Sequence, residues 1–148
     1  RRLENRMSKE KQTPMFEEMF EEAREQILSL PRTTQNWMLW MNVGFLVGLL
    51  FVFSRESARW VLAAYVVAFP IAVPFYIYTR DVAMLGVSHI LFWTPLLIYL
   101  LLEAAEDTTF SFLSLYGVWT VLLMLTITIS VAFDAMAVLK YVSQTSQD

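Results

Sequence analysis

The chain lacks the residues from which most enzyme and metal sites are built. It contains no cysteine and a single histidine among 148 residues. The absence of cysteine excludes disulfides, thiolate metal sites, thiol nucleophiles and iron–sulfur clusters, and one histidine is too few for a multi-histidine metal site. The phosphate-binding glycine loop, the nucleophile elbow and the zinc-binding helix motif are missing as well. An enzyme is therefore the less favoured class of function.

Charged residues are also scarce. They make up 17% of the sequence, and the formal net charge is −3. Nucleic acid requires a basic face, so no nucleic-acid partner is predicted. Hydrophobic residues make up 57%, and the mean hydropathy is +0.49. Because a soluble domain is about half apolar and about a quarter charged, this composition predicts an integral membrane protein with the lipid bilayer as a partner.

Four long apolar segments cover residues 37–53, 60–78, 82–102 and 110–138. A helix that crosses ~30 Å of hydrocarbon needs roughly 20 residues, which the last three segments provide and the first provides only marginally. None carries the wide polar stripe of a water-soluble bundle. Because the connections are short, consecutive helices should be antiparallel neighbours. The predicted fold is an all-α, four-helix up-down-up-down membrane bundle over residues 36–142.

The segments outside the bundle are polar. Residues 1–12 are expected to form a disordered lead, whose first six residues stand upstream of MSKEKQ, a typical natural start. An amphipathic juxtamembrane helix is predicted for residues 13–31, where Thr13 can cap it and Pro31 ends it. Residues 143–148 are a polar tail.

Basic residues predict the orientation of the bundle. In the up-down-up-down arrangement, the side that holds the chain ends carries more lysine and arginine near the bilayer than the other side. Such an excess favours the cytoplasm, so both termini of the multi-pass protein are predicted to be cytoplasmic. The basic residues are Arg24, Arg32, Arg80 and Lys140 on the first side, and Arg55 and Arg59 on the second.

The amphipathic helix has one apolar face and one acidic face. A helix on a cytoplasmic membrane surface would normally be basic on its polar side, because that leaflet is anionic. We therefore expect the helix to pack on protein, either on its own bundle or on a neighbouring subunit. A solvated helix along the membrane interface is the alternative. The residues expected to contact a partner are Met15, Phe16, Met19, Phe20, Ile27 and Leu28.

Polar residues inside the apolar segments form a candidate site. Asp134, His89 and Asn42 each lie within about 13 Å of the side that holds the chain ends, at about 1.5 Å per residue. An ionisable group inside a span is costly, so Asp134 is predicted to contact His89, Asn42 or both. Thr126 and Ser130 share its helix face at intervals of four residues. The cluster either forms a path for protons or cations, or its hydroxyls bond their own helix and hold helices together.

Three interpretations of His89 stay open. It can be a core histidine bonded to Asp134, or a proton relay, because imidazole changes charge near neutral pH. A third is ligation of haem or chlorophyll, since Gly86 one turn earlier leaves room for a macrocycle. No other cofactor is predicted.

Two further patterns concern assembly. Gly44 and Gly48 form a G-x-x-x-G motif that permits close helix contact, and on an ideal helix they point roughly opposite to Asn42, so an inward Asn42 would turn them outward. They are therefore candidates for an oligomer contact. An acidic group lies at the opposite mouth, where a symmetric oligomer would turn it into a cation-concentrating ring and a monomer would leave it as a solvated loop. Its members are Glu103, Glu106 and Asp107.

Two functional hypotheses follow. The first is a homo-oligomeric channel or transporter for protons or cations, with Asp134 and His89 as the relay. The second is a non-catalytic subunit or assembly factor of a larger membrane complex, which the acidic amphipathic helix and the glycine motif support. An intramembrane enzyme would need positioned acid–base groups, of which Asp134 and His89 supply the minimum. A haem- or chlorophyll-binding subunit is the remaining class.

Overall fold

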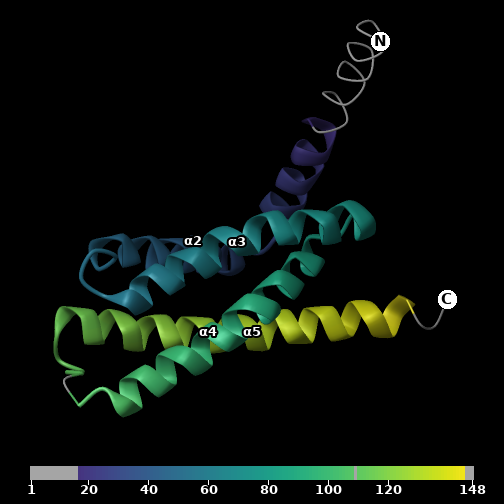
Figure 1. The fold of residues 1–148 in the computed structure, drawn as a ribbon. Helices are drawn as coiled ribbons and strands as arrows, with labels where there is room; N and C mark the ends of the chain where they lie inside the picture. The colour runs from purple at the N-terminus through teal and green to yellow at the C-terminus, as the bar shows by residue number, and fades with distance from the viewer. Residues whose placement is uncertain (1–16, 109, 146–148) are drawn as a thin grey trace, which may run out of the picture.

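The computed structural model describes residues 17–108 and 110–145. Within them, the regular structure is entirely helical, and residues 17–29 form a helix that precedes the labelled elements (Figure 1). Those elements are α2 (Arg32–Val47), η1 (Gly48–Leu50), α3 (Glu56–Thr79), η2 (Val82–Leu85), α4 (Gly86–Glu106) and α5 (Leu115–Thr145). The predicted all-α class is confirmed. The predicted lead, the start of the amphipathic helix and the last three residues of the tail lie outside the described residues.

Three helices are long and apolar enough to cross a membrane: Glu56–Thr79, Val82–Glu106 and Leu115–Gln144. Between 22% and 28% of the most apolar window of each is buried within the chain, so most of its apolar surface faces outward. Water solvates such a surface poorly, whereas lipid solvates it well. Length and composition therefore support a membrane protein with transmembrane helices.

The predicted first span has a different structure. α2 has 16 residues, opens with the polar stretch RTTQN and ends at Val47. The chain then forms the 3-10 turn η1, followed by a turn in which the Arg55 N–H donates to the Phe51 carbonyl at 2.8 Å. Hydropathy reports which solvent a segment prefers and not its backbone geometry, so the apolar run over residues 37–53 overestimates the helix. A fourth membrane-spanning helix, and with it the four-helix bundle, is not confirmed.

The helices surround an aromatic core. α4 packs against α3 and α5, and α2 packs against α5 and α3. Phe45 of α2 stacks on Tyr65 and Trp93, with ring centroids 5.0 and 4.7 Å away. It is fully buried, as are Leu100 of α4 and Ile127 of α5. Packed apolar side chains therefore fill the centre of the chain.

The molecule has two distinct ends, which serve to describe where the polar residues lie. The turn between α2 and α3 and the connection between α4 and α5 lie together on the left in Figure 1, and we call this the loop end. The turn between α3 and η2, the helix over residues 17–29 and the last turns of α5 lie toward the other side, which we call the termini end. α3 and α4 run in opposite directions between these two ends, and so do α4 and α5 (Figure 1).

Candidate functional site

The central contact is a hydrogen bond between two ionisable side chains on two candidate spans. The His89 Nδ1 of α4 lies 2.9 Å from the Asp134 Oδ2 of α5, and a quarter of each side chain is exposed. Gly86, one turn before His89, allows this approach. A Cβ at Gly86 would lie 2.8 Å from the Cβ, Cγ and Oδ1 of Asp134, which is closer than real side chains pack. The predicted contact between the two ionisable residues is therefore present.

The imidazole of His89 is fixed on a second side by Trp93. Their rings stack with centroids 4.0 Å apart and an interplanar angle of 14°, and Trp93 is 1% exposed. The imidazole is therefore held in place by two contacts, one with the Asp134 carboxylate and one with the face of the Trp93 indole.

Asn42 does not belong to this pair. Its Oδ1 accepts a hydrogen bond from the Tyr65 hydroxyl of α3, and its Nδ2 donates to the Met38 carbonyl at 2.6 Å. The predicted alternative of a contact between Asn42 and Asp134 is therefore wrong. The partner of Asn42 is instead the Tyr65 hydroxyl on the adjacent helix. The depth of Asn42 within its own segment contains no information about a partner on another helix.

Ser130 and Thr126 lie on the face of α5 that packs against α2. Both are buried, with 4% and 5% exposed. The Trp37 indole N–H donates to the Ser130 hydroxyl at 3.2 Å, and the Trp40 indole N–H donates to the Thr126 hydroxyl at 3.1 Å. Thr126 also donates to its own helix, at the Leu122 carbonyl. The two hydroxyls therefore join helices, as one of the two interpretations expected.

A third indole strengthens the contact between α2 and α5. The Trp119 N–H donates to the Gly44 carbonyl at 2.9 Å. We call these three indole bonds, from Trp37, Trp40 and Trp119, the indole seam. Trp37 and Trp40 stand at the start of an apolar segment, a position in which membrane interfaces favour aromatic residues, and nothing in the local sequence indicates their partners.

The glycine motif does not present one outward face. Gly48 is buried, and a Cβ there would lie 3.1 Å from the Trp119 ring. By contrast, a Cβ at Gly44 would have no atom within 4 Å. The expected outward orientation of the pair is thus wrong for Gly48, because η1 replaces the ideal helix there. An oligomer contact at Gly44 stays a prediction.

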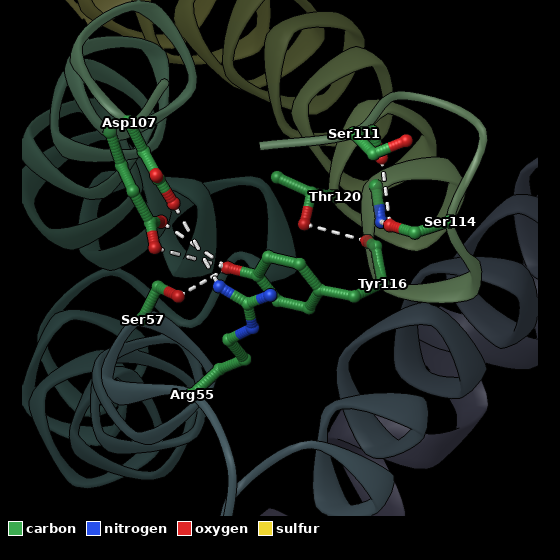
Figure 2. A network of polar contacts seen from close by, with 9 residues as sticks. Arg55, Ser57, Asp107, Ser111, Ser114, Tyr116 and Thr120 are labelled. Atoms are coloured by element: carbon green, nitrogen blue, oxygen red, sulfur yellow. Dashed lines mark hydrogen bonds and ion pairs between the residues drawn. The ribbon is translucent and has the colours of Figure 1, made fainter. Parts of the chain in front are cut away.

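The predicted acidic mouth lies at the loop end within a polar network (Figure 2). The Tyr116 hydroxyl bonds the Ser57 hydroxyl and lies 3.3 Å from both carboxylate oxygens of Glu103. The Arg55 guanidinium covers the Tyr116 ring at 4.7 Å and lies 3.8 Å from Asp107. Two of the three acidic residues are therefore bound within the chain. Glu106, the third, is exposed.

The apolar face of the N-terminal helix is divided. Met19 is buried within the chain and Ile27 is half-buried. Phe20 and Leu28 remain 69% and 58% exposed. Met15 and Phe16 lie outside the described residues. Part of the predicted partner surface thus packs on its own chain, and part stays open.

Comparisons with known proteins identify no further functional residues. Comparison with protein families, with curated proteins and with solved structures finds no match to this chain. Within residues 17–108 and 110–145, no group of three or more histidine, aspartate or glutamate side chains could hold a metal ion. The functional argument therefore rests on the Asp134–His89 pair and on the surfaces around it.

Proposed function

We propose that the chain is a multi-pass, homo-oligomeric membrane protein that carries protons or small cations past the Asp134–His89 pair. The observation that supports this most directly is the pair itself. Two ionisable side chains lie 2.9 Å apart on helices that are apolar enough to span a membrane, and each keeps a quarter of its surface exposed. Intramembrane ionisable groups are expensive and usually mark function or a structural pair, and partial exposure allows proton exchange.

The packing of the core determines where such a path would run. Phe45, Trp93 and Leu100 fill the space between the helices, so a path through the centre of one chain is disfavoured. The exposed quarters of Asp134 and His89 lie on the surface of the chain instead. We infer that the path follows that surface and is completed by another copy of the chain.

The proposed topology has four spans. α2 and η1 together would form a short first span, and both termini would lie in the cytoplasm because of the excess of basic residues at the termini end. An even number of spans places both ends on one side, as the positions of the 17–29 helix and of the end of α5 at the termini end favour (Figure 1).

Proton flux into liposomes tests the proposal. The purified chain is reconstituted with a pH-sensitive dye inside the vesicles, and a potassium gradient with valinomycin drives the flux. Asp134→Asn and His89→Gln should each lower the flux at least about tenfold, because each removes one proton-accepting group. Asp81→Asn is the matched control, since Asp81 caps η2 through the Ala83 N–H and asparagine caps equally well.

Two outcomes of this experiment would contradict the proposal. If the wild-type chain carries no flux above empty vesicles, the transport proposal is wrong. If both site variants keep the wild-type flux, the pair only holds α4 to α5.

A second candidate function is a non-catalytic subunit or assembly factor of a larger membrane complex. The observation that favours it is the exposure of Phe20 and Leu28 on an acidic helix. Native mass spectrometry of gently solubilised protein should then show a foreign chain bound to the wild type. The double variant Phe20→Ser with Leu28→Ser should lose it, and a ring of identical chains in both samples would contradict this function.

A further inference from the structure

The N-terminal helix is bound to the turn between α3 and η2 by three side-chain contacts. The Gln26 Nε2 donates to the Arg80 carbonyl at 3.0 Å, and the Gln26 Oε1 accepts from the Val82 N–H at 3.2 Å. The Arg80 Nη1 lies 3.1 Å from the Glu22 Oε2. These contacts join segments that are more than 50 residues apart in the chain.

The turn needs such support because of its backbone. Arg80 has a φ of 56° and is the only non-glycine residue with positive φ among those the structure describes. This left-handed conformation costs a residue with a side chain roughly 1 kcal/mol. Gln26 satisfies a carbonyl and an N–H that the reversed chain leaves without helical partners. A primary amide carries both a donor and an acceptor, so glutamine can make the two bonds at once.

The turn leads directly to the ion pair. Val82 begins η2, which packs against α3 and α5, and η2 ends at Leu85, immediately before Gly86 begins α4. Gly86 is the residue whose backbone lies against Asp134, and His89 follows within the same turn of α4. A displacement of η2 would therefore move Gly86 and His89 relative to the carboxylate on α5.

We propose that Gln26 is a positioning residue for the Asp134–His89 pair and that the N-terminal helix is a detachable clamp on η2. When the clamp is in place, η2 holds Gly86 against Asp134. When it lifts, the pair loosens and its proton exchanges with solvent more freely. The effect on transport rests on the proposed function, whereas the effect on the geometry of the pair does not.

The clamp is weak enough to be released. Glu22 and Arg80 are each 46% exposed, the bond of Gln26 to the Arg80 carbonyl is exposed, and its bond to the Val82 N–H is part-buried. Exposed pairs of this kind contribute little and are screened by salt. Met19, which is 6% exposed, is the one buried apolar residue of the helix among the residues described. Salt or a partner that competes for Glu22 could therefore lift the helix without unfolding the spans.

The single histidine of the chain makes the clamp measurable. With 15N-labelled histidine and a purification tag that contains none, the imidazole spectrum reports on His89 alone. We expect Gln26→Met to shift the hydrogen-bonded Nδ1 proton line and to speed its exchange with water about three- to tenfold. Gln26→Glu keeps the acceptor and loses the donor, so its effect should be intermediate. Glu25→Ala, the exposed neighbour on the same helix, should leave the line unchanged.

A cross-link separates a clamp from general damage. The chain has no native cysteine, so Glu22→Cys and Arg80→Cys can be joined by a short bismaleimide in the Gln26→Met background. The link should restore both the line position and the slow exchange. An unchanged line in Gln26→Met, or a loss that the link does not reverse, would overturn the clamp. Absence of wild-type proton flux would overturn the proposed function alone, because the imidazole line is read without it.

Discussion

At the scale of single residues, the site depends on Gly86, which has no side chain, as much as on the side chains of Asp134 and His89. Asp134 and His89 can meet because Gly86 presents only backbone to α5. The sequence predicted the pair, because ionisable groups at similar depths in apolar segments have few other partners. One of the three open interpretations of His89 used Gly86 to leave room for a macrocycle, whereas the structure places Gly86 against the Asp134 carboxylate.

Substitution of Gly86 should therefore separate the pair. In Gly86→Ala, the new Cβ would overlap Asp134, and overpacking of this kind costs about 1–3 kcal/mol. We expect lower stability in detergent and a displaced imidazole line. Gly44→Ala is the matched control, because a Cβ there meets nothing within 4 Å and alanine favours a helix by up to about 1 kcal/mol. Equal stability of the two variants would contradict the close approach.

Other residue-scale features could not be predicted, for physical reasons. Gln26 is a polar residue on a surface helix, and nothing in its neighbours distinguishes a clamp from a solvated side chain. Asn42 carries a signal of depth, but the Tyr65 hydroxyl that binds it comes from another helix. Contacts of both kinds depend on how helices are arranged, which local sequence does not determine.

At the scale of the elements, α2 is held by polar bonds as well as by apolar packing. The indole seam joins α2 to α5 through three tryptophan side chains. Composition alone would assign such side chains to the membrane interface or to an apolar core. Hydrogen bonds between helices in lipid contribute roughly 0.6 kcal/mol on average, so three bonds together are a substantial part of the association of α2.

Removal of one acceptor in the indole seam should weaken that association. Ser130→Ala leaves the Trp37 N–H without its partner and should lower the free energy of unfolding by about 0.5–2 kcal/mol, measured by titration from mild detergent into dodecyl sulfate. Ser143→Ala on the same helix is the control, since the exposed Ser143 bonds only the Lys140 carbonyl. If the indole seam does not contribute to stability, the titrations of the Ser130→Ala and Ser143→Ala variants will superimpose.

At the scale of the whole molecule, the number of spans decides where the chain ends lie. The sequence predicted a helical membrane protein, because three apolar segments provide the roughly 20 residues that a bilayer crossing requires. It could not resolve the first segment, in which apolar residues continue through the turn after Val47. With four spans the two chain ends lie on the same side of the membrane, whereas with three spans they lie on opposite sides.

Single cysteines can count the spans, since the chain has none of its own. Ser29→Cys, Ser54→Cys and Ser143→Cys place a thiol at three exposed positions. With four spans, an impermeant maleimide added to intact cells should label Ser54→Cys and leave the other two unlabelled until lysis. With three, Ser29→Cys and Ser54→Cys should react alike and Ser143→Cys in the opposite way, which would overturn the four-span topology.

The unequal helix lengths have a consequence for the lipid around the protein. α5 is about 46 Å long, whereas the apolar part of α2 and η1 spans about 22 Å. A bilayer with ~30 Å of hydrocarbon matches neither. If α2 and η1 form the proposed short span, the membrane must thin where α2 faces lipid, and each ångström of mismatch carries a cost. Copies that meet through α2 would remove that thinned strip, so bilayer thickness itself should bias how this protein assembles and which membranes retain it.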